Sequence, residues 1–133
     1  MMESNPPKVR AGFYLVGDDF DLDYVTKKLY ISPTSTRTKN DFPVPTVAHT
    51  SWELETEKEF CKAVCWQIEK LLDKLRGKEN IISELCNELN LEAIFTIVVN
   101  MESGDGPELV LTKEIVSFIG AVNAEIGFDL YID

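Results

Sequence analysis

Leu91-Glu-Ala-Ile-Phe-Thr-Ile-Val-Val-Asn-Met-Glu102 is the stretch that decides the fold. Between Ala93 and Val99 it has no charge, no Gly and no Pro, and most of its residues are β-branched or aromatic. A run with no polar face predicts a central strand that is covered on both sides. It is too short to cross a membrane as a helix, which needs about 20 apolar residues.

Size and composition indicate one globular domain that spans residues 1–133. The hydrophobic content is 44% and the charged content is 27%, which are ordinary values for a soluble protein. No charged-then-apolar leader precedes the first strand, so we expect a cytoplasmic protein without a membrane anchor. The three cysteines, Cys61, Cys65 and Cys86, are an odd number and favour buried thiols in a reducing compartment over a disulfide framework.

The net charge of −10 is unevenly distributed along the chain. Residues 1–50 are neutral overall, residues 51–90 carry −3, and residues 91–133 carry −7, with one lysine against eight carboxylates. A strongly negative surface repels phosphate backbones, which argues against nucleic-acid binding and favours a basic protein partner. Solubility is the alternative explanation of the same charge.

Apolar periodicity predicts the elements of the first half. Val9–Val16 alternates as a strand, and the stretch from Asp19 to Tyr30 has a helical stripe behind a cluster of capping carboxylates. Residues 1–8 are predicted to be a loosely ordered tail. Residues 32–48 form the longest stretch without periodicity, and a loop of this length in a compact domain is typically functional or disordered. His49–Thr56 alternates again as a half-exposed strand.

The second half continues with two predicted helices, Glu57–Arg76 and Asn80–Leu89, before the central strand. A short extended stretch, a helix capped by Thr112 and a strand at Phe128–Ile132 follow. The predicted order is β-α-β-α-α-β-(β)-α-β, with two βαβ-like halves. This order indicates an α+β fold in which helices pack on a four- to five-stranded sheet, in two layers, or in three if the middle helices cover the second face.

The chemical motifs in the chain are weak. Asp19, Asp21 and Asp23 have the spacing that opens a calcium loop, but Tyr24 and Tyr30 stand where that loop needs Gly and Glu. No Cys-x-x-Cys pair, Gly-rich phosphate loop or Gly-x-Ser-x-Gly motif is present. We therefore expect no metal, no cofactor and no enzymatic activity. A pocket that grouped the only histidine, His49, with Cys61 or a carboxylate would favour an enzyme instead.

Four segments carry a family resemblance. They are Gly12-Phe13-Tyr14-Leu15, Leu29-Tyr30-Ile31-Ser32-Pro33-Thr34, Ser51-Trp52-Glu53-Leu54 and Ile126-Gly127-Phe128-Asp129-Leu130-Tyr131. With these segments in this order, the chain resembles the bacterial family called domain of unknown function 4279. That family often has a Lys/Arg-Gly-Asp-like turn in the long loop, where this chain has Lys39-Asn40-Asp41. The family has no established enzymatic activity that the resemblance could carry over to this chain, and small acidic proteins of this kind resemble the immunity proteins that bacteria encode beside toxins.

We therefore expect a non-catalytic, acidic protein-binding module, an immunity or inhibitor protein that neutralises a basic toxin domain. The residues expected to contact the partner are Trp52, Glu53, Glu55, Asp129, Tyr131 and Asp133. Trp52 has a second interpretation as an ordinary core aromatic. The alternative function is a small-molecule binding or sensor domain with an anionic-ligand pocket near the long loop, formed by Arg37, Lys39 and His49. An exposed strand edge would also allow a homodimer.

Overall fold

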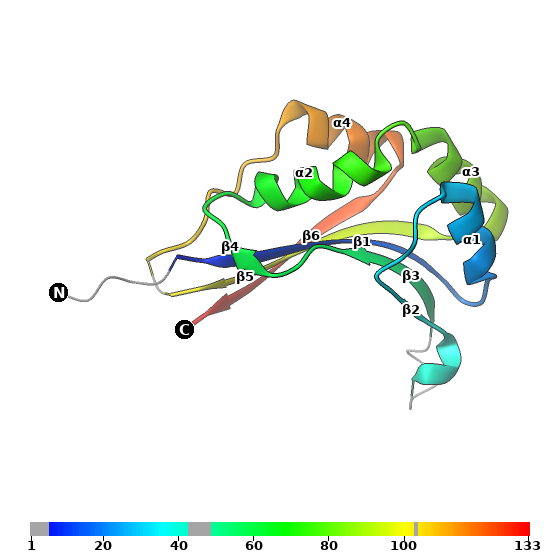
Figure 1. Cartoon of the computed structure of the whole chain (residues 1–133), viewed down its shortest axis with the longest axis horizontal. Coiled ribbons are helices and arrows are strands. Elements are labelled where there is room, and N and C mark those ends of the chain that lie inside the picture. The colour runs from blue at the N-terminus through cyan, green and yellow to red at the C-terminus, as the bar shows by residue number, and fades with distance from the viewer. Residues whose placement is uncertain (1–5, 43–48, 103) are drawn as a thin grey trace.

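A six-stranded sheet with four helices forms the fold in the computed structural model, which describes residues 6–42, 49–102 and 104–133 (Figure 1). In chain order the elements are β1 (Lys8–Gly17), α1 (Leu22–Leu29), β2 (Ser35–Arg37), the 3-10 helix η1 (Lys39–Asp41), β3 (Thr50–Glu55), β4 (Glu59–Phe60), α2 (Val64–Leu75), α3 (Glu79–Leu89), β5 (Glu92–Met101), α4 (Lys113–Ala121) and β6 (Glu125–Ile132). The predicted α+β class is confirmed.

The strands lie in the order β2-β3-β1-β5-β6, and β4 pairs separately with the beginning of β1. β1 is antiparallel to both β3 and β5, whereas β6 runs parallel to β5 after the α4 crossover. Both halves of the chain thus contain a strand, a helix and a return strand, as predicted. Only the second half has its two strands parallel, because β3 returns antiparallel to β1.

All four helices lie on one side of the sheet (Figure 1). Their buried side chains pack on alternate residues of the strands, including Phe13, Trp52 and Phe95, which are fully buried. The Phe95 ring lies 5.0 Å from Phe13 and 6.2 Å from Phe118 on α4, between ring centroids. The hydrophobic core therefore fills the space between one layer of helices and one face of the sheet.

The predicted burial of the central strand on both faces is only partly correct. Phe95, Ile97 and Val99 of β5 are buried under the helices, whereas on the other face Val98 is buried but Ile94 and Thr96 are only half-buried. β5 is an internal strand, paired on both edges with β1 and β6. A run of β-branched residues is thus compatible with one partly exposed face. The sequence allowed two or three layers, and the structure has two, one of helices and one of strands.

Two boundaries differ from the predictions, because β1 and β3 each form backbone hydrogen bonds with a segment that was not expected to be a strand. The helix expected from Glu57 begins only at Val64, since Glu59 and Phe60 form β4 against Val9 and Lys8. The long loop contributes β2, which pairs with β3, and then η1. Residues 43–48 of that loop lie outside the described residues.

The predicted tail at residues 1–8 is ordered at its end. Lys8 already belongs to β1, and the carbonyl of the buried Pro7 accepts a hydrogen bond from the N–H of Cys61, with an N–O distance of 2.9 Å. Residues 1–5 lie outside the described residues. At the other end of the chain, the last strand starts at Glu125, three residues earlier than expected.

Candidate functional site

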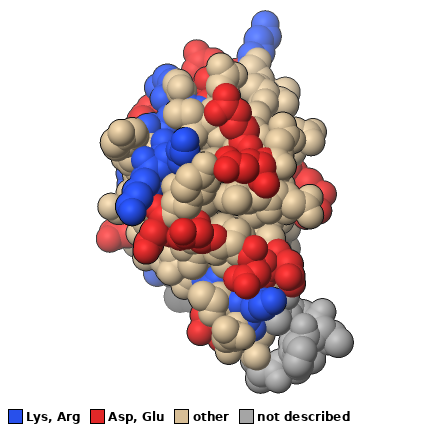
Figure 2. Space-filling model, turned by 90° about the vertical axis from the view of Figure 1, so that its right-hand side faces the viewer, with Lys and Arg blue, Asp and Glu red and all other residues tan. Residues whose placement is uncertain are grey.

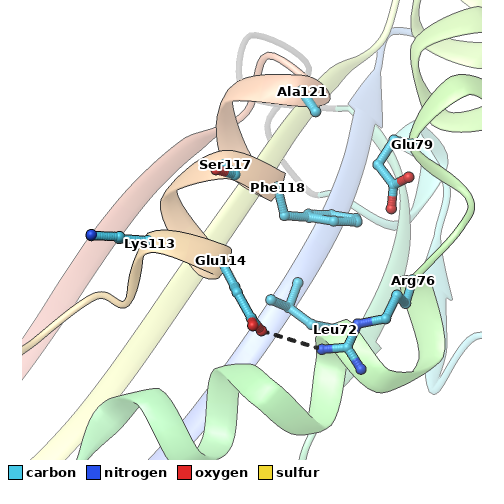
Figure 3. Close-up of a pocket in the computed structure, with 8 residues that line it drawn as sticks. All are labelled: Leu72, Arg76, Glu79, Lys113, Glu114, Ser117, Phe118 and Ala121. Carbon is cyan, nitrogen blue, oxygen red and sulfur yellow. Dashed lines mark ion pairs between the residues drawn. The ribbon is translucent and has the colours of Figure 1, made fainter.

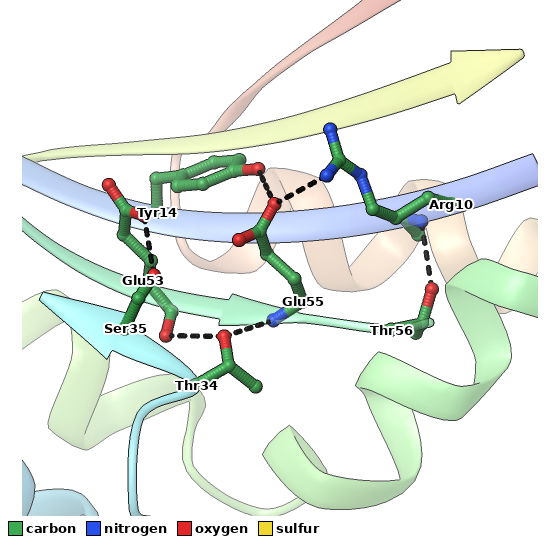
Figure 4. A network of polar contacts seen from close by, with 8 residues as sticks. Arg10, Tyr14, Thr34, Ser35, Glu53, Glu55 and Thr56 are labelled. Carbon is green, nitrogen blue, oxygen red and sulfur yellow. Dashed lines mark hydrogen bonds and ion pairs between the residues drawn. The ribbon is translucent and has the colours of Figure 1, made fainter. Parts of the chain in front are cut away.

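The sheet has one face that no described helix covers, and we call it the open face. Strand pairing places on it Ser35 and Arg37 of β2; Ser51, Glu53 and Glu55 of β3; Lys8, Arg10, Gly12, Tyr14 and Val16 of β1; Glu92, Ile94, Thr96, Val98 and Asn100 of β5; and Glu125, Gly127, Asp129 and Tyr131 of β6. The alternating pleat brings these residues to one side. Figure 4 shows part of this face.

Glu55 is the centre of a polar network on the open face (Figure 4). Its Oε2 atom accepts a hydrogen bond from the Tyr14 hydroxyl at 2.8 Å and lies 3.5 Å from Nη1 of Arg10. The backbone of Glu55 is held as well, because its N–H donates a hydrogen bond to the Thr34 hydroxyl oxygen at 3.0 Å. Backbone and side chain of Glu55 are therefore both fixed in position.

Gly12 makes the Tyr14 contact possible. A Cβ atom at position 12 would lie 2.3 Å from the Tyr14 hydroxyl oxygen and 2.6 Å from the carbon that bears it. The phenol ring therefore extends over Gly12, which is paired directly with Glu55 on β3. A glycine inside a strand typically marks such a close approach.

Glu53 lies beside this network and is held by two serines. Its Oε1 accepts a hydrogen bond from the Ser35 hydroxyl at 2.7 Å, and its Oε2 accepts one from the Ser51 hydroxyl at 2.5 Å. Each carboxylate oxygen of Glu53 thus has a neutral donor. No positive side chain pairs with Glu53 among the ion pairs of the described residues, so its negative charge stays available to a partner.

The pKa of Tyr14 is raised far above the ordinary value of a phenol. The largest cause is burial of the hydroxyl, and the hydrogen bond to Glu55 and the negative charge of that carboxylate act in the same direction, whereas Arg10 acts against them. Tyr14 is therefore a permanent hydrogen-bond donor at neutral pH. Its hydroxyl positions the Glu55 carboxylate through the 2.8 Å hydrogen bond.

Asp129 and Tyr131 share the open face with Glu53 and Glu55, but they lie on β6, three strands away from β3. Measured across the strands, β6 is therefore about 14 Å from β3. Both residues are exposed. Asp133 is exposed just beyond β6 and is held by a hydrogen bond from its N–H to the Met101 carbonyl at 3.0 Å.

The structure corrects the expected role of Trp52 as a partner contact. Its side chain is fully buried on the helix side of β3, and its indole N–H donates a hydrogen bond to the Thr26 hydroxyl on α1 at 3.0 Å. In a strand, neighbouring residues point to opposite faces, so Trp52 cannot share a surface with Glu53. The other interpretation, an ordinary core aromatic, is the one that the structure shows.

The three residues of the alternative ligand pocket lie close together but contact their own chain. The Arg37 guanidinium lies 5.2 Å from the Phe42 ring, and the His49 ring lies 4.7 Å from the same ring. Nζ of Lys39 is 3.6 Å from an Asp18 carboxylate oxygen. The positive charges expected to hold an anion are thus partly engaged within the protein.

His49 and Cys61 cannot form a nucleophile pair, because they lie at opposite ends of β1. Thr50, next to His49, pairs with Gly17, whereas Phe60, next to Cys61, pairs with Lys8. Nine residues of strand correspond to about 30 Å. Among the described residues, no group of three or more His, Cys, Asp or Glu side chains is arranged to hold a metal ion.

A cavity of about 700 Å³ lies on the helix side (Figure 3). α2, α3 and α4 surround it, and the Phe118 side chain points into it. Two of its charged groups pair with each other, since Arg76 lies 4.0 Å from Glu114. Leu72 and Phe118 contribute apolar side chains to its lining.

In the described ranges, no helix is long and apolar enough to cross a bilayer.

Negative charge is spread over the molecule. Figure 2 shows the end that carries α1 and α3, where acidic side chains form separate groups beside basic ones. On the open face, five carboxylates (Glu53, Glu55, Glu92, Glu125 and Asp129) stand against three cations (Lys8, Arg10 and Arg37). Sequence reasoning missed Arg10 and Tyr14, although Gly12 inside a strand was a signal that a side chain lies over the backbone there.

Comparison with known proteins gives one match. The profile of a family described as "Domain of unknown function (DUF4279)" matches residues 7–133, which covers all the described strands and helices. No curated protein and no solved structure matches the chain.

Proposed function

This chain belongs to the DUF4279 family, and from that premise we propose that it is a non-catalytic binding protein that neutralises a basic toxin domain. The family description assigns no activity, so the proposal depends on the surface of the molecule. It places the protein in the bacterial cytoplasm, bound to its toxin partner as an immunity protein.

The observation that carries the proposal is the open face with its fixed carboxylates. Ser35 and Ser51 hold Glu53, and Tyr14 holds Glu55, before any partner arrives. Side chains that are already positioned lose little conformational entropy on binding. A lysine or arginine from a basic partner would therefore meet carboxylates in their final geometry.

Charge favours the same kind of partner. The chain carries −10 overall, and the open face has more carboxylates than cations. Complementary charge steers two proteins together and makes their association fast and sensitive to salt.

The test takes the protein encoded beside this chain's gene as the candidate toxin. Its expression alone should arrest growth, and co-expression of this chain should restore growth. Calorimetry with the two purified proteins should give a complex whose dissociation constant rises as salt is added. Growth arrest that this chain does not relieve would contradict the proposal.

The interface is tested with two double variants of equal charge. Glu53→Gln with Glu55→Gln removes two open-face carboxylates, and we expect the dissociation constant to rise more than about tenfold. Asp73→Asn with Glu84→Gln removes two exposed carboxylates from α2 and α3, and should change it less than about twofold. Equal effects of the two double variants would exclude the open face as the interface.

A further inference from the structure

β6 is an unusually exposed strand. From Gly127 to Ile132 every residue is exposed, on both faces of the sheet. Phe128, Leu130 and Ile132 point to the helix side, yet their exposed fractions are 37%, 46% and 60%. One edge of β6 pairs with β5, and no strand in the described part of the chain pairs with the other edge.

The two outer edges of the sheet differ in their protection. β2 is three residues long and carries Arg37, and a short, charged strand discourages pairing with another chain. β6 is eight residues long, contains no Lys, Arg or Pro, and has Glu125 and Asp129 as its charged residues. A long edge whose remaining residues are mostly apolar is what proteins avoid unless another strand covers it.

We propose that β6 pairs with β6 of a second copy of this chain, antiparallel and centred on Leu130. The two sheets would join into one continuous sheet across a two-fold axis. In such an interface the same surface of both copies must be complementary to itself. This inference is independent of the proposed function, since it uses the edge of the sheet and leaves Glu53 and Glu55 uncovered.

The sequence of β6 satisfies self-complementarity about Leu130. Antiparallel pairing sets Leu130 against Leu130 of the second copy, and Phe128 against Ile132, so that one face of the joint is apolar. On the open face it sets Asp129 against Tyr131, in both directions, and a phenol can donate a hydrogen bond to a carboxylate. Directly opposed side chains lie about 4.5–5.5 Å apart, which allows these contacts.

Charge excludes the neighbouring register. Centring the pair on Asp129 would set Asp129 against its own copy and Glu125 against Asp133, which are like charges. The register centred on Leu130 brings together no carboxylates directly opposite each other. The remaining repulsion comes from the −10 of each copy and acts over a longer range, so salt should strengthen the dimer.

Sedimentation velocity with the full chain tests the proposal. The wild-type protein should be a dimer at micromolar concentration, with a dissociation constant that falls as sodium chloride is raised. Leu130→Lys should raise this dissociation constant more than about tenfold. Each copy would lose a leucine that the dimer buries, and the two lysines would face each other. Trp66→Lys makes the same change of charge at an exposed apolar residue of α2 and should leave the dimer unchanged.

Cross-linking tests the register. In Leu130→Cys the two introduced thiols face each other, and mild oxidation should give a covalent dimer that Trp66→Cys does not form. The native thiols contribute little background, since Cys61 is buried and burial raises the pKa of both Cys65 and Cys86. A wild-type monomer at high salt, or a Leu130→Lys dimer as tight as wild type, would overturn the proposal.

Discussion

At the scale of single residues, the open face depends on one small side chain. Gly12 leaves room for the Tyr14 ring, and this ring reaches Glu55 on the next strand. Glycine inside a strand normally reduces stability, because it has no side chain to pack. Here the Tyr14 ring occupies the space that a side chain at position 12 would fill. The two positions are therefore coupled.

Gly12→Ala should therefore displace the phenol and remove its hydrogen bond to Glu55. We expect a loss of about 1–3 kcal/mol in the free energy of unfolding, measured by urea denaturation. Gly127→Ala is the matched control: it lies in the same row of the sheet, and nothing lies within 4 Å of its added Cβ atom. That variant should gain about 0.5–1 kcal/mol.

The coupling can be checked in a Tyr14→Ala background, where no ring lies over position 12. There Gly12→Ala should cost far less than in the wild-type chain, so that the two substitutions are not additive. Equal costs in both backgrounds would show that the backbone at position 12, and not the tyrosine, requires glycine.

Tyr14 should also ionise only at a pH above the ordinary range of a tyrosine. Its pKa is raised in the folded protein, above the value of about 10 in an unfolded chain. The contribution of the neutral phenol to stability is thus complete below about pH 10 and is lost as the pH rises toward the folded pKa. Ultraviolet titration should show a step at this high pH that Tyr14→Phe removes and Tyr24→Phe retains.

Alternation along β3 predicts correctly that Glu53 and Glu55 point outward, because a strand has a period of two residues. The contact between Tyr14 and Glu55 could not be predicted in the same way, since it depends on how β1 and β3 are aligned across 41 residues. The same alternation places Trp52 on the inner face, whereas its aromatic character alone fits either a core residue or a partner contact. Its burial follows from α1 packing above it.

At the scale of elements, helix ends show where local strain is stored. Tyr30 ends α1 with φ of 56°, in the left-handed region, and its side chain is 90% exposed. Asn90 ends α3 with φ of 57°, and asparagine tolerates that conformation much better than tyrosine. The two helices thus end in the same left-handed backbone conformation, but with different residue types at the cap.

Tyr30→Gly should raise the free energy of unfolding by about 0.5–1 kcal/mol, because glycine adopts a positive φ without steric cost. The opposing loss is small, since the Lys78 ammonium lies 5.9 Å from the exposed Tyr30 ring. Asn90→Gly should change stability much less. Thermal denaturation of both variants gives the comparison, and a lower melting temperature for Tyr30→Gly would show that the ring contributes to folding.

Element boundaries follow from the sequence where the signal is local. Thr112 accepts a hydrogen bond from the N–H of Ile115 and begins α4 as predicted, and α3 starts within one residue of its expected position. Residues 57–63 have a helical pattern, but they form β4 and its connection, because an edge of β1 has to be covered. A pairing between segments so far apart in the chain cannot be predicted from the local pattern of about ten residues.

At the scale of the whole molecule, the excess negative charge opposes compaction. At about 0.01 M salt, charges act on each other over about 30 Å, and at about 0.1 M over about 10 Å. Raising the salt concentration between these values should therefore raise the melting temperature of the protein by several degrees, measured by calorimetry.

A variant with several exposed carboxylates changed to amides, such as Asp73→Asn with Glu84→Gln and Glu57→Gln, should respond less to salt. An identical salt response in this variant and in the wild type would show that the effect is not electrostatic.

The number of layers is the part of the fold that the sequence leaves open. Every helix has one apolar stripe, and each stripe fits either face of the sheet. All the helices pack on one face because the connections between helices and strands are short and because the helices also contact each other. The existence of the open face, and with it the candidate binding surface, therefore emerged only with the three-dimensional arrangement.

The pairing of β1 with β5 has a consequence for how the protein is made. Lys8 pairs with Asn100 and Val16 with Glu92, so each partner follows 76–92 residues later. Contacts of such long range slow folding, because a large loop must close first. On the ribosome, the first strand leaves the exit tunnel long before its principal neighbour is translated. During that interval β3 can already pair with one edge of β1, but the edge that meets β5 has no partner, and we expect the nascent chain to benefit from a chaperone.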